Sequence, residues 1–256
     1  MSVVPGKSGI SGVLRTPWYR GLKLIERRWY RNHAYPVSVP YGRRVYAPWY
    51  DPAGEFHRSW DTVHRSGHVL WEQPHGYMLY QFFKTSAAIT GDVAECGVAT
   101  GGSAHLLSLL IEADGKPRNL HLFDTFTGMP RETTVPERDA AEPGDFAASL
   151  AQVEARLAPF DFAVFHPGVI PNTLEEVADI DEYAFVHVNV VSYEATRVCL
   201  EWFWPRLKAG GAIMINEYGL YRFRRSTRQS VDEFFDSRDV PLIVLGTGQV
   251  VAIKHL

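Results

Sequence analysis

An acidic residue followed by a cluster of glycines forms the chemical centre of this sequence. The segment 92–104, DVAECGVATGGSA, begins with a short apolar run and leads into the apolar residues of 104–111. This pattern predicts a buried strand, a glycine turn and the start of a helix. Glycines allow close approach of a ligand, and a helix N-terminus attracts anionic groups, so a nucleotide-type ligand is one interpretation; strand-to-helix packing alone is the other. The candidate ligand contacts here are Glu95, Gly97, Gly101, Gly102 and Ser103.

The turn and a second acid indicate which nucleotide fits. The turn reads G-V-A-T-G-G rather than G-x-G-x-x-G, and Glu95 before it would repel a pyrophosphate. S-adenosylmethionine suits an acidic turn better, because it carries an ammonium and a sulfonium and its carboxylate can use the helix N-terminus. Asp124 ends the next predicted strand, where an acid can accept both ribose hydroxyls; a turn or cap role is the alternative.

Strands alternate with helices from residue 92 onward, which predicts a mainly parallel sheet covered on both faces. Gly246-Thr-Gly248 predicts a hairpin, so the final strand should run antiparallel to its neighbour. We therefore expect an α/β fold with a seven-stranded, Rossmann-like sheet of the class I methyltransferase type. The predicted strands are 92–98, 119–124, 162–166, 185–191, 211–217, 241–246 and 249–254. The predicted helices are 55–69, 74–89, 102–113, 145–157, 173–179, 194–207 and 226–237.

Composition excludes two broad classes of protein. The 256 residues are 46% hydrophobic with a net charge of −3, which argues against disorder and against electrostatic binding of nucleic acid. Cys96 and Cys199 lie in apolar runs without metal-type spacing, so we interpret them as core residues in a reducing compartment. The sequence shows neither a signal-peptide core nor an 18-residue apolar run, and a cytoplasmic protein is expected.

The N-terminal third differs from the rest in charge and composition. Residues 1–45 carry a charge of +8 and the remainder −11. The stretch 15–31 predicts a basic amphipathic helix, which can lie on a membrane or pack on the body of the chain or on a partner chain; we favour packing. We expect residues 1–90 to form an N-terminal arm and helical cap, residues 91–256 to form the cofactor domain, and the protein to be a homo-oligomer.

Several ordered motifs carry a family likeness over about residues 46–254. They are YAPW at 46–49, the glycine segment, FDTFTGMP, GDFAASL, HPGVIPNTL, the long segment FVHVNVVSYEATRVCLEWFWPRLKAGGAIMINEYG and the terminal GTGQVVAIK. With these motifs the chain resembles the macrocin O-methyltransferase (TylF-type) family. The resemblance implies S-adenosylmethionine-dependent O-methyl transfer to a sugar or another small natural product. It also implies cofactor contacts at the glycine segment and at Asp124, with Asp145 and Ser149 on the adenine side.

The departures from this family concern its metal site and its base. The family has H-I-D-V-D-L-Y and D-D-Y-G where this chain has HVNVVSY and NEYG. The family's magnesium-binding aspartates correspond to Asn189, Asn216 and Glu217, and its base corresponds to Val191. Magnesium prefers anionic oxygens, and two of the three carboxylates are gone, so we expect no metal here.

Three residues are candidates for a replacement base: Glu217, His187 and His166. Glu217 is favoured, because ligands bind beyond the carboxyl ends of strands in open α/β sheets, whereas a histidine inside a strand is more often a core residue. Asn189 and Asn216 could hold a hydroxyl, carboxylate or amine acceptor by hydrogen bonds. The alternative function is an S-adenosylmethionine-binding scaffold or non-methylating subunit; a nicotinamide dehydrogenase is opposed by the missing G-x-G-x-x-G.

Two further segments have an open interpretation. Residues 130–144 are polar and rich in proline, and they form either a lid over the acceptor or a plain surface loop. Residues 221–228, YRFRRSTR, either bind an anionic acceptor or start a solvated helix, and we favour the helix.

Overall fold

The computed structural model describes residues 49, 51, 53–67 and 69–255, which belong to one compact unit. The predicted basic helix at 15–31 and most of the YAPW motif lie outside these described residues. Within the described part of the chain, no helix is both long enough and apolar enough to cross a membrane.

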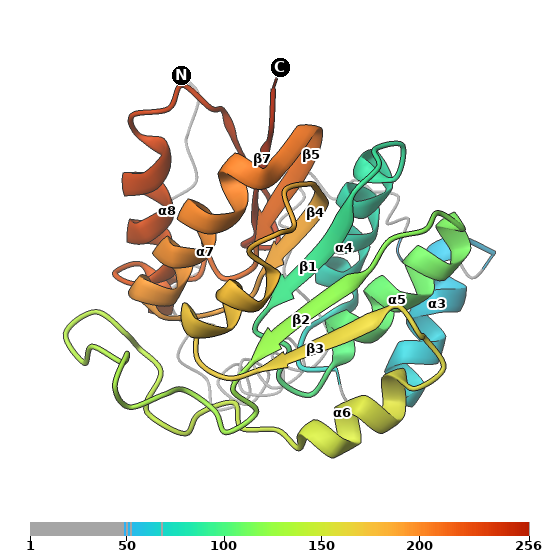
Figure 1. Cartoon of the computed structure of the whole chain (residues 1–256), viewed down its shortest axis with the longest axis horizontal. Coiled ribbons are helices and arrows are strands. Elements are labelled where there is room, and N and C mark those ends of the chain that lie inside the picture. The colour runs from blue at the N-terminus through green and yellow to red at the C-terminus, as the bar shows by residue number, and fades with distance from the viewer. Residues whose placement is uncertain (1–48, 50, 52, 68, 256) are drawn as a thin grey trace, which may run out of the picture. The chain divides into compact units, whose positions relative to one another are not determined.

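The centre of the structure is a seven-stranded sheet with the strand order β3-β2-β1-β4-β5-β7-β6 (Figure 1). Strands β1 to β5 are parallel, and β7 lies between β5 and β6 and runs antiparallel to both. The predicted fold class and the reversed final strand are therefore confirmed. The strands are β1 (Asp92–Cys96), β2 (Leu120–Asp124), β3 (Ala163–Pro167), β4 (Tyr183–Val188), β5 (Leu207–Ile215), β6 (Leu242–Val244) and β7 (Val250–Ile253).

Helices cover both faces of the sheet, with α3, α4 and α5 on one side and α7 and α8 on the other (Figure 1). The helices are α3 (Glu55–Arg65), α4 (Gln73–Ser86), α5 (Gly102–Asp114), α6 (Leu150–Leu157), α7 (Tyr193–Arg206) and α8 (Thr227–Phe235), with the 3₁₀ helices η3 (Asn172–Val177) and η4 (Tyr221–Phe223).

Two predicted helices differ from the structure. The helix expected over 145–157 begins only at Leu150, because Phe146 has a φ of +64°, which is incompatible with an α-helix, and Ser149 caps the helix. The segment expected as a helix over 173–179 forms the short 3₁₀ helix η3 instead. Both differences lie in the connections around β3 and leave the sheet order unaffected.

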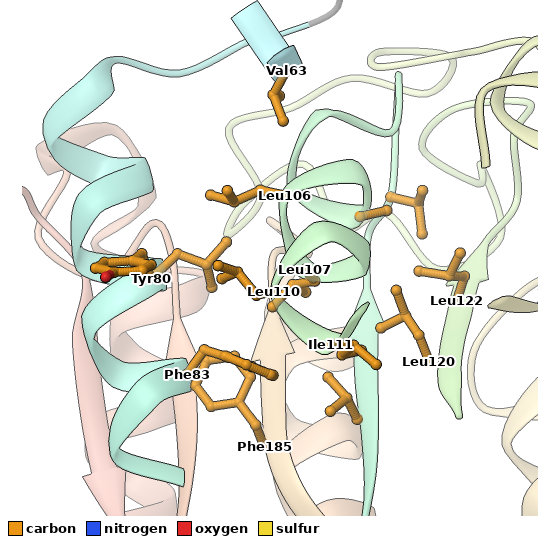
Figure 2. Close-up of a cluster of buried hydrophobic side chains, with 14 of the residues drawn as sticks. Val63, Tyr80, Phe83, Leu106, Leu107, Leu110, Ile111, Leu120, Leu122 and Phe185 are labelled. Atoms are coloured by element: carbon orange, nitrogen blue, oxygen red, sulfur yellow. The ribbon is translucent and has the colours of Figure 1, made fainter. Parts of the chain in front are cut away.

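Helices α3 and α4 share one hydrophobic core with the sheet. Phe56 and Trp60 of α3 are buried in the same cluster as Val93 of β1. Figure 2 shows Phe83 of α4 against Phe185 of β4, and the centroids of these two rings are 5.9 Å apart. The segment between α3 and α4 is thereby fixed near the carboxyl ends of the strands, where it takes part in the site described next.

Candidate cofactor and acceptor site

A cavity of about 270 Å³ lies beyond the carboxyl ends of β1, β2, β4 and β5. In open α/β sheets ligands bind at this edge of the sheet. Its walls come from the turn after β1, the loops after β2, β3, β4 and β5, and the segment between α3 and α4. Leu70 and Trp71 of that last segment line the cavity, a contribution for which the sequence carries no recognisable signal.

Gly97 joins the turn after β1 to the end of β4. Its φ is +91°, and a Cβ at this position would lie 2.7 Å from the backbone carbon and oxygen of Asn189. The backbone nitrogen of Asn189 donates to the Cys96 oxygen at 2.7 Å, and its side-chain nitrogen donates to the Gly97 oxygen at 3.2 Å. A glycine is therefore required for this close approach, and Gly97 itself lines the cavity.

Three further residues of the glycine segment, Gly101, Gly102 and Ser103, pack within the protein rather than line the cavity. Gly101 has a φ of +80°, and a Cβ there would lie 2.8 Å from a methyl group of Val153 in α6. Arg156, also in α6, donates to the Thr100 oxygen. Gly102 and Ser103 are buried in the first turn of α5, and none of these three predicted contacts is among the cavity-lining residues.

Asp124 is held at the cavity wall by backbone donors on both of its oxygens. Its Oδ2 accepts from the nitrogen of Ala99 at 2.8 Å, and its Oδ1 accepts from the nitrogen of Phe126 at 2.7 Å. Ala99 and Phe126 both have positive φ, so the two turns are shaped around this carboxylate. Each carboxylate oxygen has a further lone pair, which leaves Asp124 able to accept hydroxyl donors from a ligand.

Glu95 and His187 form a buried pair that does not line the cavity. The two residues are cross-strand partners on β1 and β4, and His187 Nδ1 lies 2.9 Å from Glu95 Oε1. Both side chains are almost fully buried. The structure thus brings Glu95 to His187, beneath the turn, rather than to the cavity surface where we expected it to meet an ammonium group.

The two residues predicted for the adenine side have different environments. Asp145 lines the cavity, and its Oδ2 accepts from the backbone nitrogen of Glu142 at 2.9 Å. Ser149 caps α6 by accepting from the nitrogen of Gln152, and it is not a lining residue. Between them, Phe146 combines an exposed side chain on the cavity wall with left-handed backbone.

Asn189, Asn216 and Glu217 all line the cavity beyond the ends of β4 and β5. Asn216 Nδ2 donates to Glu217 Oε1 at 3.0 Å, and Asn216 Oδ1 accepts from Gln249 Nε2 at 3.0 Å. Burial raises the pKa of Glu217 above its ordinary value, while the Asn216 hydrogen bond and the charges of His187 and Arg222 act against this rise.

Val191 and His166 have packing roles. Val191, at the position where the family resemblance implies a base, lines the cavity and is buried in a small apolar cluster with Ala141 and Phe223. His166 stacks on Phe123, with ring centroids 4.5 Å apart, and its ring nitrogens face His121 and Glu176. His166 is absent from the cavity lining, so among the three candidate bases only Glu217 reaches it.

The loop after β2 is tied to the rest of the site through Asp139. One oxygen of this buried carboxylate accepts from the nitrogen of Tyr193, the first residue of α7, and the other accepts from the nitrogen of Val135, both at 2.8 Å. Arg222 Nη2 also donates to the Ala140 oxygen at 2.9 Å. This loop extends past the ends of β1 and β2 (Figure 1), and Pro130 lines the cavity.

A family model described as macrocin-O-methyltransferase (TylF) matches residues 84–245, more than half of the chain. The chain belongs to this family. The resemblance that the sequence motifs indicated is therefore confirmed.

Curated relatives of this family member are O-methyltransferases. One is the 8-demethyl-8-(2,3-dimethoxy-alpha-L-rhamnosyl)-tetracenomycin-C 4'-O-methyltransferase of Streptomyces olivaceus, 31% identical over 147 residues, which cover 52% of this chain and 54% of the relative. Another is the mycinamicin III 3''-O-methyltransferase of Micromonospora griseorubida, 28% identical over 165 residues, which cover 59% and 63%. The chain thus spans between about half and two thirds of the length of these relatives.

Solved structures show the same fold. The O-methyltransferase NovP superposes with a TM-score of 0.66 at 22% identity, over 74% of this chain and 83% of NovP. The calicheamicin methyltransferase CalS11 superposes with a TM-score of 0.62 at 16% identity, over 99% of both chains. The TylF-family chain therefore has the class I methyltransferase fold.

Proposed function

We propose that this protein transfers a methyl group from S-adenosylmethionine to a hydroxyl group of a small molecule, with Glu217 as the base and without a divalent metal ion. The observation that carries the proposal is that Glu217 lines the same cavity as Gly97 and Asp124. Family membership supports the reaction class. The relatives' names include a rhamnosyl-tetracenomycin and mycinamicin III, which supports a sugar or another small natural product as the acceptor.

The residues around the turn after β1 fit the cofactor. Gly97 allows close approach, and Asp124 has lone pairs available for ribose hydroxyls. Asp145 would contact the adenine side. When bound, S-adenosylmethionine supplies an electrophilic methyl group. Glu95 would act from beneath, by holding His187 and the end of β1, rather than by touching the ligand.

The cavity wall formed by Asn189, Asn216 and Glu217 is here called the acceptor wall, because it would hold the methyl acceptor. It fits a hydroxyl group better than a carboxylate. The Glu217 carboxylate can accept a proton from a hydroxyl group, whereas it would repel an anionic acceptor. The side-chain nitrogens of Asn189 and Asn216 each carry a second hydrogen beyond the one used in their bonds to Gly97 and Glu217, and this hydrogen can hold the acceptor oxygen. A raised pKa brings Glu217 closer to the working range of a general base, and positioning of the acceptor supplies much of the rest.

The same wall does not fit a magnesium ion. It has one carboxylate, and the other two side-chain oxygens are the neutral amide oxygens of Asn189 and Asn216, which are weak ligands for a hard cation. Among the residues that the structure describes, no group of three His, Cys, Asp or Glu side chains is arranged to hold a metal. Magnesium requires several oxygen ligands in octahedral geometry, which this wall does not supply.

A transfer assay tests the proposal. The protein is incubated with S-adenosylmethionine and hydroxyl, carboxylate or amine acceptors, and S-adenosylhomocysteine is measured with and without a chelator. We expect turnover of a hydroxyl acceptor that survives chelation. Glu217→Gln should lower kcat by about 100-fold or more, the usual contribution of a general base, with cofactor affinity retained. Glu154→Gln, an exposed position on α6, is the matched control. Loss of activity in chelator with recovery in magnesium would contradict the metal-independent mechanism.

The second candidate function is a scaffold that binds S-adenosylmethionine without transferring its methyl group. It is favoured by Val191, which packs against apolar residues where the family resemblance implies a base. Cofactor binding without turnover on any acceptor would support it. The cytoplasmic location and the homo-oligomer stay predictions, to be checked by fractionation and light scattering; membrane contact through residues 15–31 concerns a segment outside the described residues.

A further inference from the structure

The side chain of Gln249 lies behind the acceptor wall, on the hairpin that leads into β7. It is only 1% exposed and is absent from the cavity lining. Its Oε1 accepts from Thr247 Oγ1 at 2.7 Å. Its Nε2 donates to the backbone oxygen of His75 at 3.4 Å and to Asn216 Oδ1 at 3.0 Å. Both polar atoms of this amide are therefore hydrogen-bonded, and of its three partners Asn216 is the one that lines the cavity.

These hydrogen bonds form a series from the His75 backbone oxygen through Gln249 and Asn216 to Glu217. Their direction follows from the acceptors at the two ends of this series. The His75 backbone oxygen can only accept, so the nitrogen of Gln249 must face it. The same nitrogen reaches Asn216, whose atom at that contact must then be the oxygen. The other side of the Asn216 amide is its nitrogen, which lies 3.0 Å from Glu217 Oε1, and an ionised carboxylate also can only accept. Both ends thus require the same orientation.

The opposite orientation of Asn216 would place two acceptors against each other. Its Oδ1 would then lie at about the 3.0 Å that now separates Nδ2 from Glu217 Oε1, and its nitrogen would face the nitrogen of Gln249. Both contacts would be repulsive in a setting where unpaired polar groups are costly. Glu217 by itself does not fix the orientation of the Asn216 amide, because it can take up a proton and then donate to the Asn216 oxygen. The nitrogen of Gln249 can only donate, so Gln249 makes the present orientation the favourable one.

We propose that Gln249 is a positioning residue of the site: it fixes the Asn216 amide with its N–H group toward Glu217 and the acceptor. The inference rests on the proposed function only for its kinetic consequence. With this orientation the wall presents a donor beside an acceptor. A hydroxyl group matches that pair, because it can receive the Asn216 hydrogen while giving its own hydrogen to Glu217.

A double-mutant cycle tests whether Gln249 acts through Asn216. Gln249→Leu removes the donor, and the exposed Gln152→Leu on α6 is the matched control. We expect Gln249→Leu to lower kcat about tenfold or more, with cofactor affinity by calorimetry within about twofold of the unsubstituted protein. In an Asn216→Ala background the same substitution should lower kcat less than about twofold, because residues in one network are not additive. Equal losses in both backgrounds would overturn the inference.

Gln249→Glu tests the orientation directly and nearly preserves the shape of the side chain. An ionised carboxylate at this position can only accept, so at a pH high enough to ionise the buried Glu it should draw the Asn216 nitrogen toward β7 and turn the oxygen toward Glu217. We expect a loss of kcat at least as large as that of Gln249→Leu. The Gln249→Glu variant also tests the proposal if Gln249→Leu fails to fold. If Gln249→Glu binds the cofactor and keeps full kcat at a pH where the introduced carboxyl group is ionised, the proposed role of Gln249 is wrong.

Nuclear magnetic resonance separates this inference from the proposed reaction. The chain has five asparagines, so selective ¹⁵N-asparagine labelling produces few side-chain amide signals, and Asn216→Ala identifies the one of interest. We expect the Asn216 amide signals to move in Gln249→Leu and Gln249→Glu, and to stay in place in Gln152→Leu. This response, even in a protein that turns over no acceptor, would support the inference while the proposed function failed. Unchanged Asn216 signals in both Gln249 variants would overturn it.

Discussion

Acid should destabilise this protein through His75, which is buried where α4 meets the hairpin between β6 and β7. Burial lowers the pKa of His75 from 6.5 to about 4, and its hydrogen bond with the backbone of Thr247 acts only partly against this. The unfolded chain therefore takes up a proton on this imidazole near pH 6.5, whereas the folded chain resists protonation until about pH 4.

The size of the effect follows from this difference in pKa. One unit of pKa corresponds to about 1.4 kcal/mol, so His75 contributes about 3 kcal/mol to the free energy of unfolding. Because the folded pKa is the lower one, the contribution is complete above pH 6.5 and is lost as the pH falls toward 4. Typical domains are stable by about 5–15 kcal/mol, so the loss is a large share of the total.

Urea unfolding between pH 7.5 and pH 4 measures this contribution. The comparison uses the unsubstituted protein, His75→Gln, and His64→Gln as a control at an exposed histidine. Because acidic groups titrate in all three proteins, the informative quantity is the difference between their unfolding free energies at each pH. We expect the unsubstituted protein to lose about 3 kcal/mol more than His75→Gln over this range, and His64→Gln to follow the unsubstituted protein. Parallel curves for His75→Gln and the unsubstituted protein would refute the reasoning.

Three further predictions concern the site. Burial raises the pKa of Glu217 above its ordinary 4.5, so ionisation of this carboxyl group opposes folding at neutral pH. Glu217→Gln should therefore have a higher Tm than the unsubstituted protein at pH 7 and the same Tm near pH 4. An equal difference in Tm at both pH values would contradict this. Gly97→Ala should cost about 3 kcal/mol in urea, from left-handed backbone and the clash with Asn189, whereas Gly115→Ala, also left-handed but in open space, should cost about 1 kcal/mol. Asp139→Ala removes the acceptor of the half-buried hydrogen bonds from the backbone nitrogens of Val135 and Tyr193, so it should cost about 1 kcal/mol or more. It should also raise the KM of the acceptor, and an unchanged KM would exclude a role of this loop in acceptor binding.

Local patterns in the sequence predicted the architecture well. Apolar runs marked the strands, and the glycine hairpin at 246–248 predicted the reversed final strand. Polar residues after strands, such as Asp124 and Glu217, were correctly expected at one edge of the sheet, because the carboxyl ends of parallel strands meet there. The helix expected from 145 was wrong because the left-handed backbone at Phe146 depends on how the loop packs, which periodicity does not report.

Residue type and spacing by themselves determined the alternation of strands and helices and the turn that needs glycine, since both depend on neighbours along the chain. The family resemblance added the expectation that two carboxylates of a metal site are replaced by amides. Only the tertiary structure decided that Glu95 faces His187, that Gly101 makes room for α6, and that Gln249 donates a hydrogen bond to Asn216. The physical reason is that burial and hydrogen-bond direction depend on residues far apart in sequence. Gln249 reaches Asn216 because β7 inserts between β5 and β6.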